Sequence, residues 1–188
     1  MYDYIDSHVR YFDKMYAKRL RTYRKTGFSI WTQELQPKQI INAIFDSVNY
    51  TEKFEQDIVE SEKRVVISSP DIRQDKIDRF LLLIKKRQEV GVKVTVITTD
   101  PEDITYGKSD VCYELIRIMQ LVGINVITRT EVEECFAVID DEIVWHGGMN
   151  LLGKADVWDN LMRIRNPQVA TELLEIALEY SEARRKSE

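Results

Sequence analysis

The chain has 188 residues, of which 44% are hydrophobic, which is enough for one compact α/β domain with an accessory segment. Its formal charge of -5 argues against a protein that coats nucleic acid with a uniformly basic surface. With two cysteines and no apolar run of membrane-spanning length, the composition excludes a disulfide framework and a transmembrane helix, so we expect a soluble cytoplasmic protein without a membrane partner.

Residues 1–60 are predicted to form a helical leader in which aromatic and basic residues are interleaved. Residues 1–30 carry a balance of +4, which leaves about -9 on the rest of the chain. Such a leader could hold a nucleic-acid backbone through charge and stacking, and its candidate cations are Arg19, Arg21, Arg24 and Lys25. The alternative is an amphipathic helix that packs on a neighbouring domain with its basic face in water.

Two further elements are expected within this leader. The segment 27–31 has the composition of a short strand, and a helix is expected to begin at Pro37. The apolar residues of this helix recur at helical spacing and include Ile40, Ile41, Ile44, Phe45 and Val48. A weaker helical pattern continues through Phe54, Ile58 and Val59.

From residue 65 the pattern alternates regularly between strands and helices. Strands are predicted over 65–70, 92–98 and 124–128, and helices over 75–90 and 109–122. This order indicates parallel strands joined by right-handed crossovers. A hairpin over 135–146, a strand over 160–165 and a helix capped by Asn166-Pro167 follow, and residues 183–188 form a charged tail.

The most informative residues are 133–140, EECFAVID, and 147–150, GGMN. Together they resemble the second half of a phospholipase D-like motif. In that superfamily one strand carries His-x-Lys and then Asp five residues after the Lys, and a second strand leads to Gly-Ser-x-Asn or Gly-Gly-x-Asn. Asp140 and Asn150 stand in place here, whereas Glu133 replaces the histidine and Cys135 replaces the lysine.

The resemblance implies a fold and an activity. The fold is a phospholipase D-like single half over residues 61–182, an α/β domain with a mixed, mostly parallel sheet flanked by helices. In the family the histidine attacks phosphorus, the lysine balances the phosphate charge and the aspartate orients an imidazole. A carboxylate at 133 would repel a phosphodiester, and a thiol at 135 supplies no positive charge, so we expect a non-catalytic domain with no cofactor and no metal.

The resemblance also bears on partners. The motif occurs once, and single-motif relatives pair as homodimers, so a homodimer is implied here. The runs YDYID at 2–6 and MYAKRL at 15–20 are similar to the tail that follows the motor core in bacterial DEAD/DEAH-type helicases with a phospholipase D-like module, some of them from restriction or conflict systems. No Walker A sequence occurs, so the chain would be an accessory part that meets DNA or RNA through the parent helicase.

Several residues are candidates for a phosphate or nucleic-acid site, in addition to the leader cations. They are Ser68 and Ser69 at the end of the first core strand, the glycine loop with Gly147, Gly148 and Asn150, and Lys154 after it. Each has a bland alternative as a packing, loop or surface residue. Asp140 either keeps the place of the family aspartate or only ends a strand and bonds its turn.

Two other functions stay open. The first is an active phosphodiesterase or nuclease with an altered site, in which His146, or a metal held by Glu133, Glu134, Asp140 and Asp141, performs the chemistry. Against it, neighbouring strand residues point to opposite faces, and a lone histidine is usually packed or hydrogen-bonded. The second is a purely structural docking or dimerisation module.

Overall fold

The computed structural model describes residues 43–104, 109–130, 132–156 and 159–185, with side chains described up to residue 178. Residues 41–188 make up one compact unit. The four leader cations and the strand expected over 27–31 lie outside the described residues, so what the sequence predicts for them stays a prediction.

Within the described residues, seven strands form one sheet in the order β1-β7-β6-β5-β2-β3-β4. The strands are β1 (Ala43–Asp46), β2 (Arg64–Ser68), β3 (Lys93–Thr99), β4 (Asn125–Arg129), β5 (Cys135–Ile139), β6 (Ile143–Gly147) and β7 (Asn160–Arg165). The helices are α2 (Tyr50–Val59), α3 (Gln74–Glu89), α4 (Ser109–Leu121) and α5 (Pro167–Arg185), with a short 3₁₀ turn, η2 (Pro101–Asp103).

The parallel core predicted from the sequence is confirmed. β2 pairs in parallel with β3, and β3 with β4, so α3 and α4 are the crossover helices between them. Each helix is followed by a glycine with positive φ, 94° at Gly91 and 83° at Gly123. Glycine adopts this conformation without steric cost, so the chain can turn from each helix into the next strand.

The mixed sheet is confirmed, but the expectation that it is mostly parallel is wrong. Of the six strand pairings in the described residues, four are antiparallel: β1 with β7, β2 with β5, β5 with β6, and β6 with β7. The reason is the connection between strands. Parallel neighbours need a long crossover, and among the neighbouring strands described here only β2–β3 and β3–β4 are joined through a helix, whereas a three-residue turn makes β5 and β6 a hairpin.

Residues 43–46 form strand β1 where the sequence pattern predicted a helix. Phe45 packs against Trp145 with ring centroids 4.9 Å apart, whereas its neighbour Ile44 is 75% exposed. The carboxylate of Asp46 accepts hydrogen bonds from the backbone N–H groups of Val48 and Asn49. These bonds hold the turn that connects β1 to α2. The local apolar spacing suits a helix, but pairing with β7 gives the backbone groups hydrogen-bond partners and partly buries Phe45.

The domain therefore begins earlier than predicted. β1 and α2 belong to the same compact unit as the rest of the sheet, so the predicted boundary after residue 60 runs through this unit. At the other end, α5 continues to Arg185 and includes the start of the charged tail expected over 183–188. The helical pattern of α5 outweighed the charge of its last residues.

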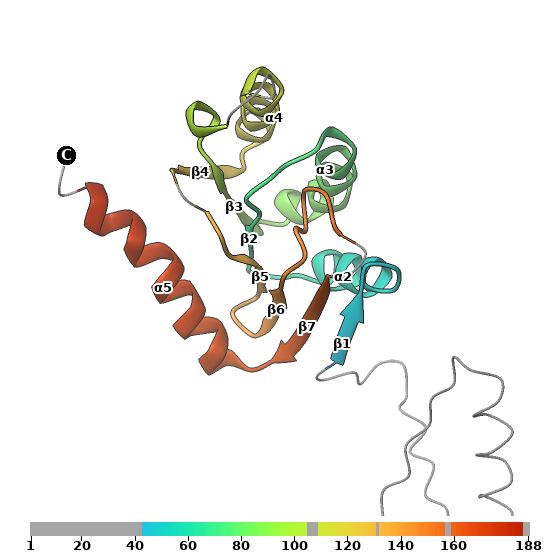
Figure 1. The fold of residues 1–188 in the computed structure, drawn as a ribbon. Helices are drawn as coiled ribbons and strands as arrows, with labels where there is room; N and C mark the ends of the chain where they lie inside the picture. The colour runs from blue at the N-terminus through green and yellow to red at the C-terminus, as the bar shows by residue number, and fades with distance from the viewer. Residues whose placement is uncertain (1–42, 105–108, 131, 157–158, 186–188) are drawn as a thin grey trace, which may run out of the picture. The chain divides into compact units, whose positions relative to one another are not determined.

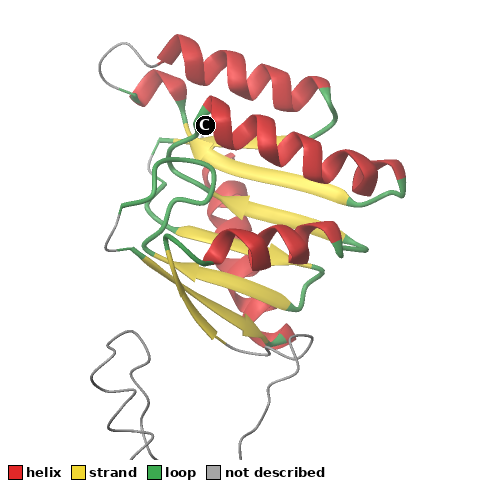
Figure 2. Cartoon of the chain, turned by 90° about the vertical axis from the view of Figure 1, so that its right-hand side faces the viewer, coloured by secondary structure: helices red, strands yellow, loops and turns green. Residues whose placement is uncertain are grey.

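Helices cover both faces of the sheet, with α2, α3 and α4 on one face and α5 on the other (Figure 1, Figure 2). The larger core lies under α2, α3 and α4 and includes Ile67, Val96 and Trp145. The smaller core lies under α5 and includes Val66 and Phe136. Because successive strand residues point to opposite faces, Val66 and Ile67 contribute to different cores.

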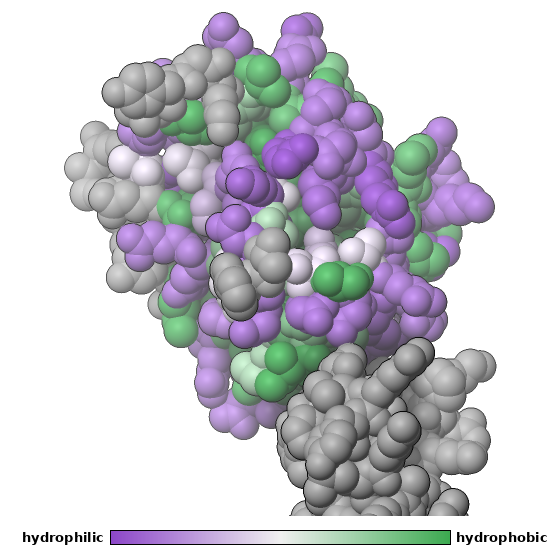
Figure 3. All heavy atoms as spheres, turned by 45° about the vertical axis from the view of Figure 1, so that its right-hand side comes forward, coloured by the Kyte–Doolittle hydropathy of each residue, from purple (hydrophilic) through white to green (hydrophobic). Residues whose placement is uncertain are grey.

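On the face shown in Figure 3, hydrophilic residues predominate and hydrophobic residues form smaller groups between them. No helix in the described parts of the chain has both the length and the apolar content that crossing a membrane requires.

Candidate functional site

The candidate site lies at the edge of the sheet where β2 ends and β5 begins. Because the two strands are antiparallel, Ser68 pairs with Phe136, and Cys135 in turn pairs with Gly147 on β6. The structure therefore brings the end of β2, the start of β5 and the glycine loop to one edge. This is the carboxyl edge of the parallel strands, where α/β sheets commonly bind ligands.

A hydrogen-bonded cluster joins the two loops at this edge. The Asn150 amide lies against the backbone of Asp71, accepting from its N–H and donating to its carbonyl at 3.0 Å each, and it contacts the hydroxyl of Ser69. That hydroxyl donates to the Asp71 carbonyl and accepts from the backbone N–H of Leu152, both at 3.0 Å. Ser69 and Asn150 therefore hold the loops together, and their polar atoms are already engaged.

Ser68 has a similar local role on the other side of the strand. Its hydroxyl donates to the backbone carbonyl of Glu134 at 2.7 Å, and the residue is 2% exposed. This bond fixes the segment that leads into β5. The side chains of Glu133 and Glu134 remain exposed at the edge of the site, so the charge they present to solvent is negative.

Cys135, which the sequence resemblance aligns with the lysine of the motif, is buried. Burial raises the pKa of its thiol, and the nearby negative charge of Asp159 raises it further. The group is therefore a neutral thiol at neutral pH. It offers neither a cation for a phosphate nor a thiolate nucleophile.

Close contacts with neighbouring backbone explain two of the three glycines in and after the loop, Gly147 and Gly153. A Cβ atom on Gly147 would collide with the backbone carbonyl of Asn160 on β7. A Cβ on Gly153 would lie 2.6 Å from the Asp71 carbonyl oxygen. Gly148 is exposed, and a Cβ there would meet only the carboxyl group of Asp159, at 3.3 Å. Close approach of backbones thus explains Gly147, and Gly148 has more room.

Asp140 lies at the opposite edge of the sheet. It follows the last residue of β5, about five residue steps or roughly 17 Å along the strand from Cys135. Its carboxylate accepts from three backbone N–H groups, those of Glu62 at 2.8 Å, Lys63 at 2.7 Å and Arg64 at 3.1 Å. Asp140 therefore anchors the start of β2 and does not reach position 133.

His146 is exposed and lies on the face of the sheet that α5 covers. It pairs with Phe136 and Met162, and Phe136 belongs to the core under α5. Cys135 pairs with Gly147 on the opposite face, so alternation separates His146 from Cys135. The structure does not bring His146 together with the glycine loop cluster of Ser69 and Asn150.

The four carboxylates suggested as metal ligands are divided between two edges. Glu133 and Glu134 precede β5, whereas Asp140 and Asp141 follow it, and Asp141 forms an ion pair with Arg64. Among the described residues, no group of three or more His, Cys, Asp or Glu side chains is arranged to hold a metal ion. The proposed carboxylate site is therefore contradicted within that part of the chain.

Lys154 is an exposed loop residue. Its side chain is 73% exposed, and its amino group lies 4.0 Å from a carboxylate oxygen of Asp156. A pair this exposed contributes little to stability. Its amino group is therefore accessible to a ligand, and among the described residues it forms no built site.

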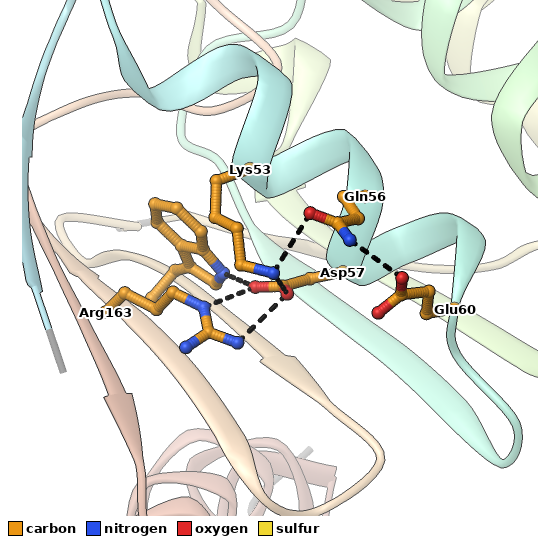
Figure 4. Close-up of polar contacts among 6 residues, drawn as sticks. Lys53, Gln56, Asp57, Glu60 and Arg163 are labelled. Atoms are coloured by element: carbon orange, nitrogen blue, oxygen red, sulfur yellow. Dashed lines mark hydrogen bonds and ion pairs between the residues drawn. The ribbon is translucent and has the colours of Figure 1, made fainter. Parts of the chain in front are cut away.

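A buried charged cluster that the sequence reading missed lies under α2. Asp57 accepts from Arg163 at 2.6 and 3.0 Å, from the indole of Trp145 at 2.9 Å and from Lys53 at 3.0 Å (Figure 4). The pattern held a clue, because Asp57 stands between Phe54 and Ile58 on the inward side of the helix. An acidic residue on such a face needs a partner.

A second group that the sequence reading missed is Arg129, at the end of β4. It lines a pocket of about 280 Å³ between the sheet and α5, together with Ser68, Glu133, Glu134 and Ile176. The pocket lies on the α5 face, opposite the cluster of Ser69 and Asn150. No local sequence pattern marks Arg129, because the residues around it come from four separate segments, at 68, 97, 132–136 and 176–177.

No protein-family model matches the chain, and no curated protein matches it. Solved structures do match. Nuc of Salmonella typhimurium, described as a phospholipase D family member, superposes with a TM-score of 0.55 at 17% identity, over 71% of this chain and 89% of that one. NucT of Helicobacter pylori gives 0.52 at 16% identity, over 75% and 95%.

A third match is TrmBL2, described as an archaeal chromatin protein with a novel mode of DNA binding. Its TM-score is 0.55 at 15% identity, over 91% of this chain and 60% of that one. Identities this low establish the architecture alone. Because these structures superpose on most of the chain, it has the phospholipase D-like fold.

Proposed function

We propose that this chain is a non-catalytic phospholipase D-like domain that assists a helicase in binding nucleic acid. The observation that carries the proposal is the chemistry at positions 133 and 135. Glu133 presents an exposed carboxylate where the motif has a histidine, and Cys135 is a buried neutral thiol where the motif has a lysine.

These two replacements oppose phosphodiester cleavage for separate reasons. A carboxylate repels the substrate phosphate, and a neutral thiol cannot balance the charge that builds up on phosphorus oxygens. The remaining polar groups of the edge are occupied, since Ser68, Ser69 and Asn150 all bond to the chain itself. The domain keeps the loop architecture and lacks the groups for the reaction.

Nucleic acid is the proposed ligand because of the leader and the fold. The leader concentrates cations and aromatic residues, which suit a phosphate backbone and unstacked bases. One protein of the same architecture, TrmBL2, is described as binding DNA. The helicase context rests on the resemblance of residues 2–6 and 15–20 to a helicase tail.

Self-association is part of the proposal. Ile44 on β1 and Met162 on β7 pair with each other and point to the same face of the sheet, 75% and 43% exposed. Val48, just beyond β1, is 87% exposed. Exposed apolar side chains next to each other favour contact with another protein surface. Sedimentation of the chain, with Ile44→Lys and Met162→Lys introduced together, tests this: a dimer that becomes a monomer supports it.

An altered active site is not favoured by the geometry of the described residues. His146 and the glycine loop cluster lie on opposite faces, and the four carboxylates lie at two edges. A His146→Ala variant assayed for phosphodiester cleavage with and without EDTA tests this alternative. Cleavage that depends on His146 or on a metal would overturn the non-catalytic assignment.

The binding proposal is tested by fluorescence anisotropy with single-stranded and duplex oligonucleotides over a range of salt. Four substitutions to glutamine are combined in the leader, at Arg19, Arg21, Arg24 and Lys25. For every phosphate that the variant no longer neutralises, the slope of log affinity against log salt should become shallower by about 0.7 to 0.9. The variant is therefore expected to bind more weakly and with a weaker salt dependence.

The matched control removes the same charge from the folded domain. It combines four exposed cations, changed to glutamine at Arg73, Arg79, Lys86 and Arg117. We expect this variant to keep most of the affinity and the salt slope. Equal losses in both variants would mean that net charge, and not the leader, governs binding.

A further inference from the structure

β4 is the last strand of the sheet, and one of its edges is open: within the described residues only β3 pairs with it. The carbonyl of Arg129 accepts from the backbone N–H of Asp100, directly after β3, at 2.8 Å, so the backbone groups of Arg129 point toward β3. These groups alternate in direction along a strand, so the N–H and C=O of Val126 and Thr128 point away from β3. Such an edge offers hydrogen bonds to another strand.

A groove of about 550 Å³ lies beside this edge, where α4 is next to β4 (Figure 1). Thr128 lines the groove from β4, and Pro101 lines it from η2. The residues that α4 contributes follow the three- and four-residue spacing of one helix face: Asp110, Tyr113, Glu114, Ile116, Arg117 and Gln120. An open strand edge beside a groove is the arrangement in which an extended peptide adds to a sheet and places alternate side chains in pockets.

The groove is acidic. Its lining has four carboxylates and one guanidinium, which belong to Asp100, Glu102, Asp110, Glu114 and Arg117. The guanidinium of Arg117 lies 3.8 Å from the carboxylate of Glu114, so a carboxylate already offsets the one positive charge. Partial burial raises the pKa of the Tyr113 hydroxyl, and the negative charges of Glu102 and Asp100 raise it further. The groove therefore attracts a cationic partner.

The charge also sets aside two other occupants. Nucleic acid is disfavoured, because the carboxylates would face its phosphates. A second copy that paired through its own β4 is disfavoured as well, because two sets of the same carboxylates would meet in one groove. A protein segment that carries lysine or arginine has the complementary charge and can supply the backbone groups of a strand.

We propose that β4 and α4 form a docking site for a basic, extended segment of another protein. The segment pairs with the edge of β4 through Val126 and Thr128, and its alternate side chains place cations beside the carboxylates of the groove. This site lies apart from positions 133 and 135, and the inference does not depend on the proposed nucleic-acid binding.

The first experiment measures binding of a fluorescent peptide by anisotropy. The probe has about ten residues, the upper end of usual strand lengths, with lysine and valine in alternation. A second peptide has glutamate in place of lysine. We expect the lysine peptide to bind and the glutamate peptide not to bind. No binding of the lysine peptide up to roughly millimolar concentration, or equal binding of both peptides, would overturn the proposal.

A proline at the edge tests the pairing itself. Thr128→Pro removes an N–H that points away from β3, so it should abolish peptide binding without breaking a hydrogen bond to β3. Thr128→Ala loses the same side chain and keeps the N–H, so it is the matched control and should bind. Normal peptide binding by folded Thr128→Pro would overturn the proposal.

Hydrogen exchange in the unsubstituted chain tests the same point even if Thr128→Pro does not fold. The lysine peptide should slow exchange of the backbone amides of Val126 and Thr128. The amide of Ile127 points toward β3 and should change little. Peptide binding with unchanged exchange at both Val126 and Thr128 would overturn the proposal.

The acidic lining is tested by Glu102→Gln combined with Asp110→Asn. Removing two exposed charge pairs should weaken binding of the lysine peptide by about twofold to thirtyfold. The control combines Glu172→Gln and Glu175→Gln, which are exposed on α5, and should bind normally. Equal weakening in both variants would assign the attraction to net charge and would overturn the groove as its source.

Two further measurements identify a different occupant. A dimer that dissociates in Thr128→Pro, measured by sedimentation, would assign the edge to a second copy and overturn the proposal. An oligonucleotide that competes with the lysine peptide at this edge would also overturn it. We expect Thr128→Pro to bind oligonucleotides as the unsubstituted chain does, so a failure of the proposed function and a failure of this inference are distinguishable.

Discussion

The guanidinium of Arg163 on β7 and the carboxylate of Asp57 on α2 form a bidentate ion pair in the interior of the domain, with both residues 3% exposed or less. The pair joins an early helix to a late strand, 106 residues apart in the sequence. The indole of Trp145 also donates a hydrogen bond to this carboxylate, and Lys53 forms an ion pair with it. This cluster fastens α2 to the sheet.

Removing one member of this pair should be costly. Arg163→Met leaves the buried carboxylate of Asp57 without its main partner, so we expect a loss of about 3–5 kcal/mol in the free energy of unfolding. Urea denaturation measures it. Arg79→Met is the control, because the Arg79–Glu55 pair has its arginine 63% exposed and should cost less than about 1 kcal/mol. Similar losses in both variants would contradict the anchoring role of Asp57.

Asp140 should matter for stability in proportion to its backbone contacts. Asp140→Ala removes three accepted hydrogen bonds and leaves alanine at a φ of 54°, so a loss on the order of 2–4 kcal/mol is expected. Asp140→Asn keeps one acceptor and tolerates this backbone conformation, so it should lose less. Thermal unfolding of both variants checks the order. An Asp140→Asn variant with unchanged stability would show that the carboxylate charge contributes nothing, and losses as large as those of Asp140→Ala would contradict the expected order.

The cluster of Ser69 and Asn150 should behave as a unit. Ser69→Ala and Asn150→Ala are each expected to cost about 1–3 kcal/mol, because each leaves backbone groups of Asp71 or Leu152 without these partners. The double variant should cost less than the sum, by about 0.5–3 kcal/mol. Thr171→Ala, at an exposed hydroxyl on α5, is the control and should change stability by less than about 0.5 kcal/mol. Additive losses would mean that the two side chains act independently.

Cys112 should make stability fall at high pH. Burial raises the pKa of its thiol to about 11, from an ordinary 9.0, with smaller contributions from Asp71 and Asp100. Between these two values the unfolded chain releases the proton and the folded chain keeps it, so the folded state loses stability as pH rises from 9.0 to about 11. Unfolding measured at about pH 8.5, 9.5 and 10.5 should show a shallower decline for Cys112→Ala. Parallel pH profiles would contradict the raised pKa.

The sequence by itself determined the elements whose residues carry a periodic pattern. β2, β3 and β4 were predictable because their apolar runs alternate with amphipathic helices, and the β5–β6 hairpin because strand formers flank a short turn. The absence of a His-x-Lys string at residues 133–135 was also readable, because such a string is local in the sequence. The fold followed from the order of these parts.

Only the tertiary structure decided what depends on distant partners. Residues 43–46 carry a helical pattern and still form a strand, because β7 offers a hydrogen-bonding edge more than 100 residues away. Alternation alone cannot say which face is covered, so the separation of His146 from Asn150 and the partial burial of Arg129 beside α5 came from packing. The charge of Asp57 is tolerated inside the domain because β6 and β7 supply its donors, and no local segment contains them.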